Sequence, residues 1–367
     1  MSACRHCGRT DPIFSRRLGY CAACIRGHFA EVWPEIEAYH QESRRAFKLP
    51  LAAPQDPAGK GCTLCFHACR IPEGGYGFCG ARRVEGGRLR GGNPAGAGLS
   101  YYYDPLPTNC VADWFCPEGT HASQSISAQH YGPEGGRFNL AVFYHACNFN
   151  CLFCQNWTFK KATFRKDKVS AADLAAAAHS RTACICYFGG DPTPQLPHAL
   201  AASRLARDAA KKAGRALRIC WETNGAMQEA WLKPLAESAL GSGGIIKFDL
   251  KAFSEEMHQA LCGVSNSRTL KNFALLAARL GERPEVPLLT ASTLMVPGYV
   301  DLEEIHGLAR YLARLNPEIP YSLLAFYPQF YLPDLPITSR DFALAARQTA
   351  LDAGVKQVNL GNIHLLR

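Results

Sequence analysis

From about residue 137 onward, apolar strand-like segments alternate with amphipathic helical segments. The strand candidates are residues 139–145, 183–188, 217–222, 245–250, 288–296, 321–326 and 357–360. Helical patterns lie between them, at 170–180, 195–213, 227–240, 266–280, 301–314 and 339–353. This alternation predicts a parallel sheet covered by helices. Six or more such units favour a closed or partly closed barrel over a three-layer sheet, and the pattern leaves the degree of closure open.

Residues suited to chemistry follow these strands at their carboxyl ends. In a β/α barrel those ends share one face, and the active site is built there. The sequence therefore predicts one site made from Cys147–Cys154, Gly189-Gly190-Asp191, Glu222-Thr223-Asn224, Asp249 with Lys251, and Val296-Pro297-Gly298.

The chain has 17 cysteines, and eleven of them fall within or beside tight Cys-x2-Cys or Cys-x3-Cys groups. The N-terminal residues carry no apolar export signal, so we expect a cytoplasmic protein. In a reducing compartment such grouping indicates metal binding rather than disulfides.

Cys147, Cys151 and Cys154 place three thiols within eight residues, directly after the first strand. A [4Fe-4S] cluster held by three cysteines keeps one iron open to a substrate or cofactor. Zinc would need a fourth ligand, for which His145 and Cys184 are candidates.

Two further cysteine groups precede the barrel. Cys4, Cys7, Cys21 and Cys24 form two Cys-x2-Cys pairs, which predict a small zinc ribbon, with a rubredoxin-like iron as the alternative. The second group is less regular and is predicted to hold zinc or a second iron–sulfur cluster; it comprises Cys62, Cys65, Cys69 and Cys79. We expect the nearby His67 to face solvent.

These features divide the chain into four parts. Residues 1–45 are predicted to hold the ribbon and a helix over 27–45, and residues 46–61 form a linker. Residues 62–135 form a cysteine-rich accessory region, and residues 136–367 form the barrel. Cys110 and Cys116 have no evident role, whereas buried core positions are expected for Cys184, Cys186, Cys220 and Cys262.

The formal net charge of +9 does not indicate nucleic-acid binding. Filling two four-cysteine zinc sites and one three-cysteine cluster would add eleven negative thiolate charges and six positive metal charges. The net charge of the metal-loaded protein would then be about +4. The Arg and Lys residues are also scattered rather than clustered along a groove. No apolar run approaches the roughly 18 residues of a membrane span, so we expect neither nucleic acid nor a membrane as a partner.

The segment YHACNFNCLFCQNW (Tyr144–Trp157) resembles the cluster-binding loop of the radical S-adenosylmethionine (SAM) superfamily. Lys247–Leu270 is similar to pyruvate formate-lyase activating enzymes. Cys62–Arg83 and Leu324–Asn362 resemble the AmmeMemoRadiSam radical SAM proteins, a branch of the same group. The resemblance begins at about Cys62 and implies a partial (β/α)6-type TIM barrel, an oxidoreductase activity, and an electron donor such as flavodoxin or ferredoxin.

The resemblance also implies roles for individual residues. SAM would chelate the open iron of the cluster, and the residues expected to contact SAM are Gly189, Gly190, Asp191, Glu222, Asn224, Asp249, Lys251 and Val296. Glu222, Thr223, the Lys247 carbonyl and Asp249 align with a site that holds a monovalent cation in the activating enzymes. Hydrogen bonding of the two carboxylates to loop amides is an equal alternative.

Three functions remain open. A radical SAM enzyme that acts on a small molecule is slightly favoured, because the extra cysteines precede the SAM motif rather than follow it. The first alternative is an activating enzyme that modifies a partner protein or peptide. The remote alternative is a non-catalytic zinc-ribbon adaptor, which would have no reason to keep three cysteines at this spacing.

Overall fold

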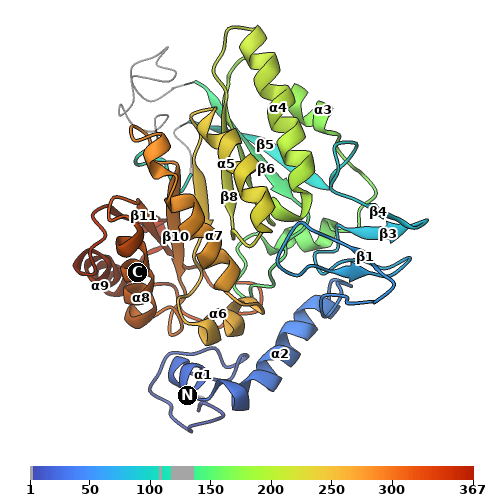
Figure 1. The fold of residues 1–367 in the computed structure, drawn as a ribbon. Coiled ribbons are helices and arrows are strands. Elements are labelled where there is room, and N and C mark those ends of the chain that lie inside the picture. The colour runs from blue at the N-terminus through green and yellow to red at the C-terminus, as the bar shows by residue number, and fades with distance from the viewer. Residues whose placement is uncertain (1–2, 107–109, 117–135) are drawn as a thin grey trace.

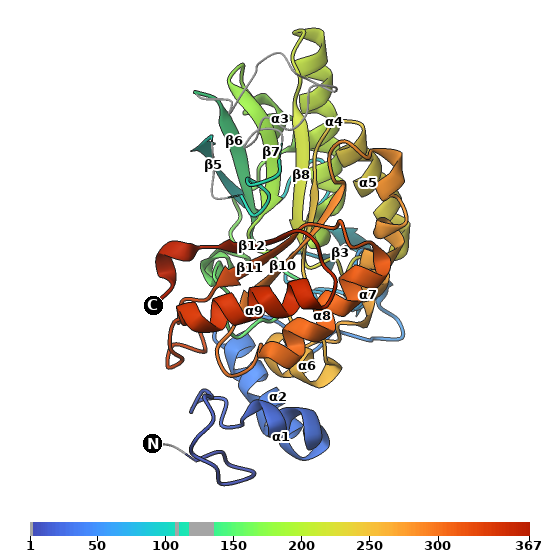
Figure 2. The ribbon, with the colours of Figure 1, turned by 90° about the vertical axis from the view of Figure 1, so that its left-hand side faces the viewer.

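The computed structural model describes residues 3–106, 110–116 and 136–367, so the predicted accessory region 62–135 is described only in part. Within these ranges the largest sheet has eight strands in the order β12-β11-β10-β9-β8-β7-β6-β5 (Figure 2). The strands are β5 (Leu99–Pro105), β6 (Phe138–Tyr144), β7 (Thr182–Phe188), β8 (Arg218–Thr223), β9 (Ile246–Asp249), β10 (Leu289–Met295), β11 (Tyr321–Ala325) and β12 (Val358–Gly361).

The sheet has the strand order of a β/α barrel that has not closed. From β6 to β12, each strand pairs in parallel with the next strand along the chain. β5 pairs antiparallel with β6 at one edge, and β12 forms the other edge. Six β/α units followed by β12 give the predicted partial barrel, which is confirmed as a mixed α/β fold around a parallel sheet.

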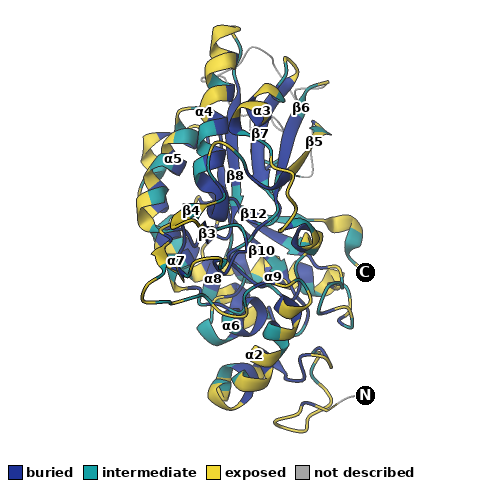
Figure 3. Cartoon of the chain, turned by 90° about the vertical axis from the view of Figure 1, so that its right-hand side faces the viewer, coloured by how far each residue is buried: buried dark blue, intermediate teal, exposed yellow. Residues whose placement is uncertain are grey.

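Helices cover the outer face of this sheet because alternate strand residues are apolar there. Ile185 and Tyr187 of β7 and Ile219 and Trp221 of β8 belong to the main hydrophobic core. The covering helices bury one face and expose the other (Figure 3). They are α3 (Ala171–Ala176), α4 (Leu196–Lys212), α5 (Leu232–Leu240), α7 (Ser267–Ala277), α8 (Leu302–Leu315) and α9 (Arg340–Asp352).

The N-terminal residues form α1 (Ala22–Gly27) and α2 (Phe29–Arg45), which lie under α6 (Glu255–Cys262) in Figure 1. Their apolar side chains, such as Ile25 and Ile36, join the main core of the barrel. The helix predicted over 27–45 is therefore present, and it packs on the barrel rather than standing apart.

Residues 60–90 form two small antiparallel hairpins beside the barrel. They consist of β1 (Lys60–Gly61) with β2 (Arg70–Ile71) and β3 (Arg83–Glu85) with β4 (Arg88–Arg90). Short 3-10 helices occur at Trp157–Ala162 (η1), Thr193–Gln195 (η2), Glu229–Trp231 (η3), Leu280–Glu282 (η4) and Ile363–Leu365 (η5). Among the described residues, no helix combines the length and apolarity needed to span a membrane.

Candidate active site

The cluster loop, Cys147–Cys154, follows β6 directly. It is held from below by α6, because Asn150 N donates to Cys262 O at 3.0 Å and Leu152 N donates to Leu261 O at 2.9 Å. Phe149, Leu152 and Phe153 are buried, whereas the three cysteines are only half-buried. The loop thus anchors itself through apolar side chains and leaves its three cysteines partly exposed.

The three thiols suit a polynuclear cluster better than a single ion. Among the described residues, no three of the loop's sulfur atoms lie within 4.8 Å of one another. A cubane cluster holds its cysteines further apart than one tetrahedral ion does, so this spacing fits a [4Fe-4S] group. Burial, with the neighbouring Cys151, raises the pKa of Cys154 to about 11, so a bound metal must supply the charge that ionises the thiols.

Gly189 and Gly190 allow the loop after β7 to pack against the residues that lead into the cluster loop. Gly190 has a φ of +58°, and a Cβ atom there would lie 2.1 Å from Tyr144 O and 2.5 Å from Ala146 O. Asp191 N donates to Ala146 O at 2.8 Å. Glycine is required here because only a residue without a Cβ fits this close approach.

The buried Asp191 carboxylate joins the ends of β7 and β8. It accepts hydrogen bonds from Asn224 N at 2.7 Å, Thr193 N at 2.8 Å and Thr223 Oγ1 at 3.0 Å. Burial raises the pKa of Asp191, although these hydrogen bonds oppose the shift. Its side chain therefore fixes the two loops, which leaves its backbone as the part suited to contact SAM.

Asn224 continues the same connection to the cluster loop. Its side-chain Nδ2 donates to Asn148 Oδ1 at 2.8 Å and lies 3.8 Å from Cys147 Sγ. Asn224 is thus a predicted SAM residue whose side chain reaches a cluster thiol.

At the end of β9, Lys251 Nζ donates to Asp249 Oδ2 at 2.6 Å, and Ser292 Oγ donates to Asp249 Oδ1 at 2.8 Å. Burial lowers the pKa of Lys251, but Asp249 and Cys151 outweigh it, so the net shift is upward and the ammonium stays charged. Val296, by contrast, is fully buried in the main core. Lys251 and Asp249 therefore face the cluster loop, while the Val296 side chain packs inward.

Three of the four groups predicted to hold a monovalent cation have another partner, namely the side chains of Glu222, Thr223 and Asp249. Glu222 Oε1 accepts from Lys247 Nζ at 2.8 Å, and Thr223 Oγ1 donates to Asp191. Asp249 is paired with Lys251. The Lys247 ammonium thus supplies positive charge beside Glu222, and the cation site stays a prediction.

Residues 141–312 match the family model described as the radical SAM superfamily, which covers the cluster loop and the ends of β6 to β10. The chain is a radical SAM enzyme. It is 26% identical over 310 residues to an uncharacterized protein of Methanocaldococcus jannaschii, a match that covers 82% of this chain and 81% of the relative.

Two named relatives are activating enzymes. The pyruvate formate-lyase 1-activating enzyme of Escherichia coli K12 is 29% identical over 39% of this chain and 58% of its own length. The isethionate sulfite-lyase activating enzyme of Desulfovibrio desulfuricans is 31% identical over 44% of this chain and 46% of its own length. This radical SAM enzyme is therefore similar to the pyruvate formate-lyase activating group, although the matches span only about half of those relatives.

Solved structures give weaker matches. A domain of a pyruvate-formate lyase-activating enzyme from Bacteroides vulgatus has a TM-score of 0.37 at 20% identity and covers 49% of this chain and 99% of that domain. Streptococcus suis SuiB bound to the precursor peptide SuiA has a TM-score of 0.45 at 14% identity and covers 60% of this chain and 47% of SuiB. The family assignment does not rest on these two structures.

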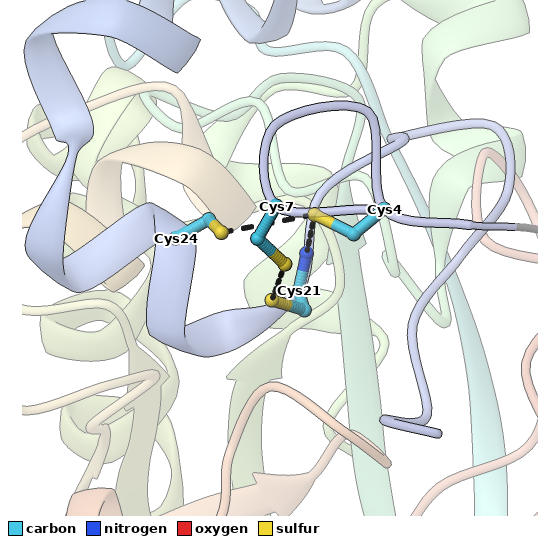
Figure 4. A group of neighbouring side chains, drawn as sticks. All are labelled: Cys4, Cys7, Cys21 and Cys24. Carbon is cyan, nitrogen blue, oxygen red and sulfur yellow. Dashed lines mark hydrogen bonds between the residues drawn. The ribbon is translucent and has the colours of Figure 1, made fainter. Parts of the chain in front are cut away.

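The N-terminal cysteines of this radical SAM enzyme converge on one point (Figure 4). The ligand atoms of Cys4, Cys7, Cys21 and Cys24 all lie within 4.8 Å of one another, which is the spacing of a single tetrahedral ion. Burial opposes ionisation of Cys4, but hydrogen bonds from the backbone of Cys7 and Cys21 lower its pKa to about 6. The same unit carries a second, exposed group. The ligand atoms of His6, His28 and Glu31 lie within 4.8 Å of one another.

The second cysteine group is more widely spaced. Cys62, Cys65, Cys69 and Cys79 are all buried, yet no three of their sulfur atoms lie within 4.8 Å. Each of Cys65, Cys69 and Cys79 interacts electrostatically with other members of the group. The four thiols thus share one region but lack the tight spacing of the ribbon.

His67 connects this second group to the cluster loop. It does not face solvent as expected from the sequence, because its Nε2 lies 2.9 Å from Asn148 O and its ring lies between Phe66 and Phe78. Burial lowers the pKa of His67 to about 4. A path of two peptide units, the His67 side chain and one hydrogen bond therefore joins Cys65 to Asn148, the residue next to Cys147.

A polar network behind the cluster loop is absent from the sequence predictions. Asn150 Nδ2 lies 3.1 Å from His40 Nδ1 and donates to Ser43 Oγ at 2.8 Å, and His40 Nε2 lies 3.0 Å from Ala260 O. Lys160 Nζ donates to Asn150 Oδ1 at 2.9 Å. The only sign of this network in the sequence was that two polar residues, His40 and Ser43, lie on the otherwise apolar face of α2.

Proposed function

We propose that this enzyme binds a [4Fe-4S] cluster through Cys147, Cys151 and Cys154 and uses it to cleave SAM reductively. The supporting observation is the cluster loop itself: three half-buried cysteines on a loop fixed by α6, packed against Gly189–Asp191 at the carboxyl ends of the strands. When bound, the cluster supplies one electron that splits SAM into methionine and a 5′-deoxyadenosyl radical, which then abstracts a hydrogen atom from the substrate.

The chain's own residues would position SAM and compensate the negative charge of the cluster. The backbone of Gly189 and Gly190 can approach a ligand closely because neither has a side chain. Lys251 and Asp249 offer a cation and a carboxylate at the edge of the same mouth, suited to the carboxylate and amino groups of an amino acid. Buried Lys160 places positive charge behind the thiols, where it offsets the negative charge of a thiolate-bound cluster.

A triple substitution tests this proposal. We expect Cys147→Ala, Cys151→Ala and Cys154→Ala together to remove about four irons per chain and to abolish dithionite-dependent formation of 5′-deoxyadenosine. Cys184→Ala is the control, because it removes a buried thiol of the barrel outside the cluster loop and should leave SAM cleavage intact. Unchanged SAM cleavage in the triple variant would show that the proposed assignment is wrong and leave the non-catalytic adaptor as the better interpretation.

For the other metals, we propose zinc at Cys4, Cys7, Cys21 and Cys24, which the tight spacing supports. At Cys62, Cys65, Cys69 and Cys79 the wider spacing favours a second iron–sulfur cluster over zinc. Such a cluster could receive electrons from a flavodoxin or ferredoxin and pass them along the His67–Asn148 contact. We expect Cys69→Ser to lower iron rather than zinc. Thiol sites of this kind suit the reducing cytoplasm.

Two classes of substrate remain candidates. The sequence favours a small molecule, whereas the named activating-enzyme relatives favour a partner protein or peptide. Incubation with deuterated candidates separates them, since the label moves into 5′-deoxyadenosine only from the true substrate. Label transfer from a deuterated glycine in a partner protein would support the activating role, and transfer from a small molecule would support the other.

A further inference from the structure

Three cysteines line the inner face of the barrel. Cys184 and Cys186 of β7 and Cys220 of β8 alternate with residues that face the covering helices, and Cys186 pairs directly with Cys220 across the two strands. All three are buried, yet none belongs to the main hydrophobic core. They are buried, as the sequence predicts, but they lie on the inward side of the sheet rather than under the covering helices.

Two more cysteines reach the same place from residues 110–116. This segment is fixed to β11, because Trp114 Nε1 donates to Ser322 Oγ at 3.1 Å and Ser322 Oγ donates to Val111 O at 3.0 Å. Cys116 interacts most strongly with Cys220 and then with Cys110 among the thiols around it. Three separate segments of the chain therefore bring five thiols together inside the barrel.

Two buried cations face these thiols. Lys247 Nζ lies 2.7 Å from Cys110 Sγ, 3.2 Å from Cys186 Sγ and 2.8 Å from Glu222 Oε1. Arg218, also buried, interacts with Cys116 and Cys220. Glu222 is a carboxylate partner of Lys247, and both cations also face thiols, which are weak hydrogen-bond acceptors when neutral. Thiolates bound to a metal would compensate the charge: four thiolates on a 2+ cluster core carry a net charge of −2.

We infer that Cys110, Cys116, Cys186 and Cys220 hold a further iron–sulfur cluster inside the barrel. Soft thiolate ligands select zinc, copper(I) or iron–sulfur clusters. Among the described residues, no three of these sulfur atoms lie within 4.8 Å, in contrast to the ribbon, which favours a polynuclear group over one ion. Cys184 Sγ donates to Asn139 Oδ1 at 3.4 Å, away from Lys247, so we leave it outside the proposed ligand set.

The cluster would lie on the inner wall, just before the loop that begins at Gly189, and its presence does not depend on SAM cleavage. The test therefore uses the background in which Cys147, Cys151 and Cys154 are alanine, so that iron at the cluster loop does not contribute. Iron, acid-labile sulfide and zinc are measured per chain in anaerobically reconstituted protein, together with Mössbauer spectra.

We expect Cys186→Ser with Cys220→Ser to lose two irons for a [2Fe-2S] cluster or four for a [4Fe-4S] cluster, with matching sulfide. Cys110→Ser with Cys116→Ser should give the same loss, and because these two residues lie outside the sheet, this pair answers the question if the strand pair misfolds. Cys184→Ser is the matched control and should keep the iron. Unchanged iron in both pairs, loss of zinc alone, or an equal loss in Cys184→Ser would overturn the inference.

Discussion

Lys160 Nζ lies 2.9 Å from Asn150 Oδ1, in the interior directly behind the cluster loop. Burial, with a contribution from Arg44, lowers the pKa of Lys160 to about 8, while the three cluster thiols oppose that shift. At pH 7 the side chain still carries its charge. The contact therefore places a buried positive charge where it can act on the cluster and ties that charge to the loop itself.

Lys160→Met is expected to lower the reduction potential of the cluster by tens of millivolts, because removal of a nearby cation disfavours the more negative reduced state. The measurement is a potentiometric titration followed by electron paramagnetic resonance. Lys161→Met is the control, since Lys161 is exposed and stacks on Trp157 at 4.7 Å. Equal shifts in the two variants would contradict a specific role for Lys160.

His40 should make stability depend on pH in the acid range. Burial lowers the pKa of His40 to about 4 from its ordinary value of 6.5. Between these values the unfolded chain binds the proton and the folded chain does not, so stability falls as the pH falls from 6.5 toward 4. At pH 5 this histidine costs about 2 kcal/mol relative to pH 7.

The measurement compares wild type with His40→Gln in urea at both pH values. The variant should lose about 2 kcal/mol less than wild type on going from pH 7 to pH 5. Taking the difference between the two proteins removes the pH dependence of metal binding that they share. An identical loss in both would mean that His40 is already protonated in the folded protein.

Gly190→Ala should be far more damaging than a comparable change elsewhere. An added Cβ would meet Tyr144 O and Ala146 O, and we expect a loss of roughly 3 kcal/mol or more, with SAM cleavage reduced at least tenfold because the cluster loop is displaced. Gly214→Ala is the matched control: its φ is also positive, at +67°, but its Cβ would have no neighbour within 4 Å. That variant should lose only about 1 kcal/mol and keep activity. Similar behaviour of the two would refute the packing argument.

Loss of the ribbon metal should release the N-terminal unit from the barrel. Cys24→Ser is expected to lose one zinc per chain and to increase hydrogen exchange over residues 4–36, because so short a segment depends on its metal to fold. The ion pair of Arg26 with Asp301, at 2.7 Å, would be lost with it. His6→Ala tests the neighbouring exposed group and should keep the zinc. Iron in place of zinc at this position would contradict the metal assignment.

The periodic part of the fold could be predicted closely. The pattern at 217–222 corresponds to β8 (Arg218–Thr223), and that at 339–353 corresponds to α9 (Arg340–Asp352). Strand β5 was missed because its tyrosines Tyr101, Tyr102 and Tyr103 are all exposed at an edge, so the segment shows no alternation. Helix α6 was missed because eight residues give too short a period to recognise.

The candidate site was harder to predict than the fold. The cluster cysteines and the strand-end glycines could be recognised in the sequence from their spacing. Lys247 shows the opposite case: the sequence suggested a role for its carbonyl, whereas its buried side chain contacts Glu222, Cys110 and Cys186. Cys184 and Cys186 had a usable signal, since two residues apart on a strand means one shared face. What they face depends on residues 110–116, far away in the chain.

The N-terminal unit also changes how this protein can be divided. The family model spans residues 141–312. The main hydrophobic core extends beyond it on both sides, to Leu18 and Ile36 before it and to Leu335 and Ala346 after it. The carbonyl of Leu152 in the cluster loop accepts from Tyr331 N, outside those limits. A fragment cut at the family boundaries would therefore expose apolar surface on both sides and lose supports of the loop. The boundaries of the family model thus differ from the boundaries of the hydrophobic core. Truncation experiments should keep all the residues that form the core.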